Sequence, residues 1–184
     1  MTTTTAAPGT LSTWTLDSAH TEVGFEVKHM MFAKVRGRFT DLEGTLQIGS
    51  PDEESTASVV IRAASIDTGQ AQRDEHLRSP DFFDVERFPR LTFEGTGVRR
   101  DEGRLLLAGT LTIRDVARQV ELEVEESGRG IDPWGKERIG FTATATIDRR
   151  DFGLTWNQAL ETGGILVGNE VRIVIELQAV RQES

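Results

Sequence analysis

The sequence predicts an all-β fold in which about eight antiparallel strands form a barrel or a sandwich. From Thr13 onward, runs rich in Val, Ile, Thr and Phe are bounded by Gly, Asp, Asn and Pro. Within several of these runs apolar and polar residues alternate, which is typical of strands with one buried face. Only one stretch has the features of a helix. About eight strands suffice to close a barrel.

The clearest strand runs from Thr21 to His29, where Val23, Phe25 and Val27 share one face. Comparable patterns predict further strands at 42–48, 57–66, 90–100, 105–113, 120–124, 138–148 and 169–180. A short helix is expected from Gly69 to Ser79, because Asp67 or Thr68 can cap its start and Pro80 follows its end. The helix interrupts the series of strands once.

The chain has 184 residues and a net charge of −9. The length limits the number of domains, and the charge limits the kinds of partner that it can bind. We expect a disordered leader over residues 1–12 and one domain over residues 13–181. The negative charge disfavours nucleic acid, and no apolar run reaches the ~20 residues of a membrane span, so no stable membrane insertion is expected. The leader lacks the basic start and apolar run of a secretory signal, and we expect a cytoplasmic protein.

No motif for catalysis or metal binding is found. Cysteine is absent, and His20, His29 and His76 have no ligand partner at a defining spacing. No G-x-S-x-G motif occurs, and the segment Gly95–Gly97 is not followed by a helix. We therefore expect no metal, no cofactor and no enzyme. Two alternatives stay open: an acid–base enzyme that modifies a small lipid with a buried His29, and a solid barrel that forms a homodimer through a strand edge.

Several short motifs occur in a distinctive order and carry a family resemblance. They are WTLDSAHTEVGFEVKHM (14–30), VRGRFTDLEGTLQI (35–48), RDEHLRSPDFFDVERFPRLTF (73–93), LTIRDVARQVEL (111–122), DPWG (132–135), IDRRDFGL (147–154) and VGNEVRIVIEL (167–177). The chain resembles the YceI-like family of polyisoprenoid-binding proteins over about residues 11–180. One departure is Asp115, at a turn where the family usually has Gly; Asp tolerates left-handed backbone geometry.

The resemblance implies an eight-stranded, lipocalin-like antiparallel barrel with one short helical insertion and an apolar pore. The implied ligand is a long isoprenoid lipid, of polyprenyl phosphate or prenylquinone type, which the protein carries or sequesters. Inward strand positions supply the expected lining, Trp156 is expected near an opening, and His29 is expected to bond the polar head. The expected ligand-binding residues are Phe25, Val27, His29, Phe39, Phe93, Leu105, Leu107, Ile113, Ile147 and Trp156.

Other features have two interpretations. Alternation alone favours a barrel filled by its own side chains over one that holds a ligand. The charged run from Asp148 to Asp151 could receive an anionic head group, but such a run more often forms a solvated turn. Trp14 and Trp134 are expected to pack over the barrel ends. The glycine-containing loop from Asn157 to Gly168 could gate the barrel mouth.

Overall fold

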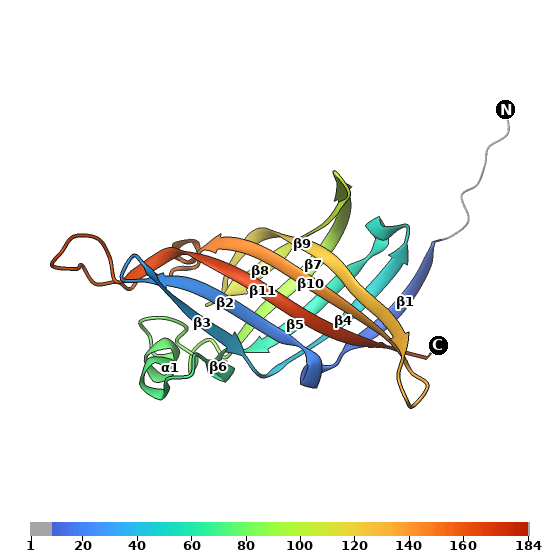
Figure 1. Cartoon of the computed structure of the whole chain (residues 1–184), viewed down its shortest axis with the longest axis horizontal. Coiled ribbons are helices and arrows are strands. Elements are labelled where there is room, and N and C mark those ends of the chain that lie inside the picture. Colours follow the sequence, from blue (N-terminus) through green and yellow to red (C-terminus); the bar gives the residue numbers. More distant parts are fainter. Residues whose placement is uncertain (1–8, 184) are drawn as a thin grey trace.

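Eight antiparallel strands close a barrel in the computed structural model, which describes residues 9–183 (Figure 1). The ring order is β1-β4-β5-β7-β8-β9-β10-β11, and β1 closes it by pairing with β11. The ring strands are β1 (Thr10–Leu16), β4 (Leu42–Ser50), β5 (Thr56–Arg62), β7 (Arg90–Asp101), β8 (Arg104–Ile113), β9 (Val116–Ile131), β10 (Glu137–Asp148) and β11 (Val167–Arg181). The predicted eight-stranded antiparallel barrel is confirmed.

Three further strands extend the wall from the long strand β11. β2 (Glu22–His29) pairs with β11, β3 (Ala33–Phe39) pairs with β2, and the short β6 (Ile66–Asp67) pairs with β3. Four 3₁₀ turns connect strands: η1 (Ser18–His20), η2 (Asp52–Glu54), η3 (Ala63–Ser65) and η4 (Arg149–Phe152). The extension lengthens the barrel on the side of the helical insertion (Figure 1).

The strands of the structure differ from those expected at two places. β1 begins at Thr10, so residues 10–12 of the expected leader lie in a strand; residues 1–8 of that leader lie outside the described residues. β3 was not expected, because its charged residues interrupt the apolar pattern. It nevertheless alternates Val35, Gly37 and Phe39 opposite basic residues.

The helical insertion is confirmed as α1 (Ala71–Arg78) and lies at one end of the barrel (Figure 1). The carboxylate of Asp74 holds its start by accepting hydrogen bonds from the backbone N–H of Thr68, at 2.9 Å, and from the Thr68 hydroxyl. Arg114 fixes the segment after the helix, because its Nη1 donates to the backbone oxygens of Phe82, at 3.0 Å, and Gly153, at 3.4 Å. Asp115 has a φ of 60°, in the left-handed region.

The core lies between the walls of the barrel and includes Trp14, which is 1% exposed. Trp134 differs from the expectation: it is 79% exposed, because its turn projects beyond the end of the sheet. Between residues 9 and 183, no helix has the length and apolar character needed to cross a membrane.

Candidate functional site

An apolar cavity of about 340 Å³ lies inside the barrel and receives side chains from nearly every strand. Eight of the ten residues expected at the site line it: Phe25, Val27, Phe39, Phe93, Leu105, Leu107, Ile113 and Ile147. The alternation of apolar and polar residues along the strands explains why these residues face inward. On β9, for example, Leu122 and Val124 face the cavity while Glu121 and Glu123 are exposed. The barrel is therefore not filled by its own side chains.

One end of the cavity opens to solvent. Several of the residues that line the cavity at this end are also exposed at the surface. This open end is formed by Asp52, Thr56, Arg100, Glu126 and Arg129. Its charges are paired: Arg100 Nη2 lies 2.6 Å from Asp52 Oδ2, and Arg129 Nε lies 2.7 Å from Glu126 Oε1. The open end is therefore polar but locally neutral.

The opposite end is closed by buried side chains that meet behind the helical insertion. This closed end is formed by Phe82, Arg149, Phe152 and Leu154, and Phe152 is only 1% exposed. Ile139, which pairs with Arg129 of the open end, lies ten residues before Arg149. That length of extended strand spans roughly 33 Å. The cavity is long and narrow rather than round.

Arg149 is the buried charge at the closed end, with 5% of its surface exposed. Its Nε donates to the backbone oxygen of Gly168 at 2.8 Å, and its Nη1 donates to those of Leu154 and Trp156 at 2.7 and 2.9 Å. Its Nη2 donates to the backbone oxygen of Val167 at 3.3 Å. Burial lowers the pKa of the guanidinium.

The charged run that contains Arg149 divides between the interior and the surface. Asp148 and Arg150 form an exposed pair, with Arg150 Nη2 at 2.6 Å from Asp148 Oδ2, as expected of a solvated turn. Hydrogen bonds from Arg150 lower the pKa of Asp148 to about 2. Arg149 turns the other way, into the cavity. The interpretation as a solvated turn therefore holds for Asp148, Arg150 and the exposed Asp151, but not for Arg149.

His29 is not among the residues that line the cavity. It is half-buried at the last position of β2, where it pairs with Ala33 and Val167. The inward face of β2 reaches the cavity at Val23, Phe25 and Val27, and Val167, the partner of His29 on β11, also lines it. His29 therefore differs from the expectation in that it is not part of the cavity lining, and its bond to a polar head group stays a prediction.

Trp156 also lies outside the lining. Its ring is half-buried and packs edge-on against His76, with ring centres 4.7 Å apart, and lies tilted against Phe82, with ring centres 5.4 Å apart. His76 in turn bonds Asp81, with Nε2 and Oδ2 at 2.8 Å. Trp156 thus holds the insertion against the closed end, and Phe82 is the ring that reaches the cavity.

Sequence reasoning missed the residues that the insertion contributes. Leu77, Phe82 and Phe83 line the cavity from a segment with no strand periodicity. Phe83 packs edge-on against Phe39, with ring centres 5.7 Å apart. The aromatic pair Phe82-Phe83 was the available signal, because adjacent aromatic residues in a connection need a buried surface to cover.

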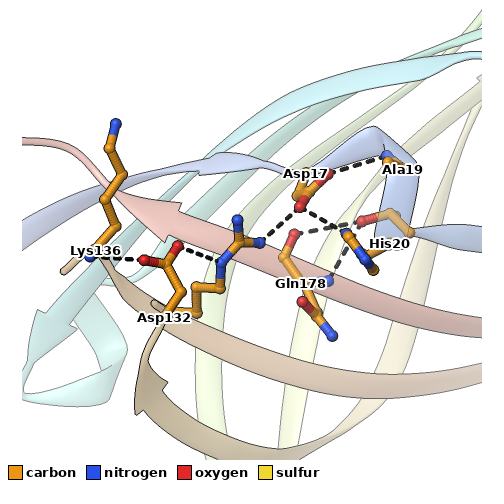
Figure 2. A network of polar contacts seen from close by, with 8 residues as sticks. Asp17, Ala19, His20, Asp132, Lys136 and Gln178 are labelled. Atoms are coloured by element: carbon orange, nitrogen blue, oxygen red, sulfur yellow. Dashed lines mark hydrogen bonds and ion pairs between the residues drawn. The ribbon is translucent and has the colours of Figure 1, made fainter. Parts of the chain in front are cut away.

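A polar network ties the chain together near the start of β10 (Figure 2). Arg138 joins two carboxylates: its Nη1 lies 2.6 Å from Asp17 Oδ2 and its Nε lies 2.9 Å from Asp132 Oδ2. The hydrogen bond from Arg138 is the main cause that lowers the pKa of Asp17. The backbone N–H of Lys136, and then Arg138, lower the pKa of Asp132. Two segments that are distant in the sequence, the one around Asp17 and the β9–β10 hairpin, are thereby fixed to each other at this end.

The described part of the chain contains no cluster of three or more His, Cys, Asp or Glu side chains able to hold a metal ion. The cavity walls offer mainly aliphatic and aromatic contacts, with polar groups confined to the two ends. Such a site can bind a long apolar molecule by shape and burial.

Comparison with known proteins gives consistent matches. The family model of the YceI-like domain matches residues 14–179. Protein YceI of Salmonella newport is 33% identical over 168 residues, which are 91% of this chain and 85% of that protein. The crystal structure of the YCEI protein of Campylobacter jejuni is 32% identical, covers 91% of this chain and 97% of that one, and superposes with a TM-score of 0.71.

Two more distant structures share the fold. BcnA of Burkholderia cenocepacia is 23% identical, with a TM-score of 0.77, and the match covers 89% of this chain and 98% of BcnA. A polyisoprenoid binding domain from Saccharophagus degradans is 17% identical, with a TM-score of 0.67, and the match covers 94% of this chain and all of that domain.

Proposed function

Because this chain belongs to the YceI-like family, we propose that it binds a long isoprenoid lipid inside the barrel and carries or sequesters it. The ligand class is that of polyprenyl phosphates or prenylquinones. The family resemblance supports the proposal, as does the shared fold with a domain described as binding polyisoprenoids. The proposed function is binding without chemical conversion.

The observation that carries the proposal is the shape and composition of the cavity. It extends from the polar open end to the closed end and is walled by apolar side chains of the barrel strands. Burial of apolar surface contributes roughly 25 cal/mol for each Å² removed from water. A linear isoprenoid gains from burial along its whole length, and the gain is reduced by the ordering of the flexible chain.

Neither alternative gains support from the geometry. An acid–base enzyme built on His29 needs that imidazole in the cavity, and it lies outside the lining. A solid structural barrel needs an interior filled by side chains, and this interior is hollow. Lipid binding uses both the hollow and its apolar walls.

The proposal is tested by narrowing the cavity. Ala143 lines it on β10, and Ala143→Leu adds volume there without polar atoms. We expect the affinity for geranylgeraniol, measured by displacement of a fluorescent lipid, to fall by roughly tenfold or more, because the added side chain takes space from the lipid.

The matched control is Thr144→Leu on the same strand. Thr144 lines an outer polar groove formed by strands β7 to β11, away from the cavity, so this change should leave the affinity unaltered. Equal effects of the two variants, or no binding by the unmodified protein, would count against lipid binding inside the barrel. Circular dichroism verifies that both variants are folded.

A further inference from the structure

The charges that line the cavity do not balance. Five charged residues face it, and four of them form the two ion pairs of the open end: Asp52 with Arg100, and Glu126 with Arg129. The fifth is Arg149. Within residues 9–183, no carboxylate makes an ion pair with its guanidinium, and neighbouring Asp148 is paired with Arg150. The cavity lining therefore contains one arginine without an ion-pair partner, at its closed end, where the nearby Asp148 carboxylate acts on it through space and without contact.

We propose that Arg149 binds the anionic head group of the lipid, a phosphate or a carboxylate, at the closed end of the cavity. This inference rests on the proposed function and deepens it by choosing anionic lipids over neutral ones such as alcohols and quinones. The apolar chain then extends from Arg149 toward the open end. The head group lies in the interior, and the far end of the chain lies nearest to solvent.

The hydrogen bonds of Arg149 leave room for such a ligand. A guanidinium has five N–H donors, and four are directed at the backbone oxygens of Leu154, Trp156, Val167 and Gly168. One Nη2 N–H remains for a further acceptor. The carbonyl dipoles hold the side chain in place but do not neutralise its charge, which an anion would do.

The surroundings strengthen this attraction. Phe152 and Leu154 are buried beside Arg149, so water screens the charge only weakly. Arginine stays protonated even where burial lowers its pKa, because its ordinary value is so high. Charge-assisted hydrogen bonds to phosphate or carboxylate are stronger than those to a neutral oxygen.

The test compares three lipids with the same chain: geranylgeranyl monophosphate, geranylgeranoic acid and geranylgeraniol. We expect the unmodified protein to bind the two anions roughly ten- to a hundredfold more tightly than the alcohol. Arg149→Gln should lower the affinity for the two anions much more than the affinity for the alcohol, and so remove most of this preference. Arg100→Gln at the open end is the control, and it should keep the preference.

A second measurement does not depend on the folding of an arginine variant. In the unmodified protein, the side-chain Nε–H resonance of Arg149 should shift when the phosphate binds and stay in place when the alcohol binds. Equal affinity for all three lipids with no shift would overturn the assignment while leaving lipid binding intact. If none of the three lipids binds, the proposed function itself fails.

Discussion

Two arginines, one at each end of this barrel, have different roles. At the open end Arg138 is shared by Asp17 and Asp132, which come from the start of the chain and from the β9–β10 turn (Figure 2). At the closed end Arg149 has only backbone oxygens as partners. The first arginine fixes chain segments to each other, and the second leaves a charge available to a ligand.

The Arg138 network predicts a pH-dependent contribution to stability. Asp17 and Asp132 have lowered pKa values, so the network stabilises the fold above the ordinary aspartate range. This stabilisation is lost as the pH falls through the lowered values, because the carboxylates then take up protons. Urea unfolding should show Arg138→Gln to be less stable than the unmodified protein at pH 7, with a smaller difference at pH 2.5. A difference that is independent of pH would contradict this role.

At the scale of elements, β1 is the strand that closes the ring, although its sequence resembles a polar leader. It pairs with β4 on one side and with β11 on the other. Trp14 anchors it: the ring is buried, and its Nε1 donates to the hydroxyl of Ser12 at 2.8 Å. Trp134 stands on the exposed β9–β10 turn.

These two tryptophans provide a matched pair of substitutions. Trp14→Ala should lower the free energy of unfolding by ~3–5 kcal/mol, because it opens a cavity in the core and loosens the closing strand. Trp134→Ala should change it by less than about 0.5 kcal/mol, because the side chain packs on little. Chemical denaturation of both variants is the measurement. Similar losses in the two variants would contradict the role of buried Trp14 as the residue that anchors β1.

Local pattern predicted those strands whose two faces differ in polarity. The Val120, Leu122 and Val124 face of β9 is an example, and its inward direction follows from alternation alone. β1 and β3 were not predicted as strands, because threonine in β1 and arginine in β3 interrupt the apolar pattern. Closure was harder to foresee, since the pairing of β1 with β11 joins residues at opposite ends of the chain. No local period encodes such a contact.

The residues of the candidate site likewise fall into those that the strand pattern predicted and those that it did not. Eight lining residues followed from their place on strands, whereas His29 and Trp156 lie beyond the reach of the cavity. Arg149 and Arg150 are adjacent and chemically identical, yet only Arg149 is buried. The η4 turn decides which arginine faces inward, and the sequence does not reveal its direction. The cytoplasmic location and the homodimer stay predictions.

At the scale of the whole molecule, the barrel encloses a long, narrow cavity that suits a linear ligand. Its wall is a continuous hydrogen-bonded ring, one end is polar, and the other is covered by the helical insertion. Such a structure should retain its lipid through gentle purification, because the apolar chain has no favourable route into water.

Isoprenoid binding inside the barrel is therefore tested by organic extraction of the gently purified protein, followed by mass spectrometry. We expect one isoprenoid lipid per chain, with an anionic head group, and a reduced amount from Ala143→Leu purified in parallel. If the folded protein carries no lipid and takes up none when mixed with isoprenoids, this barrel is not an isoprenoid carrier.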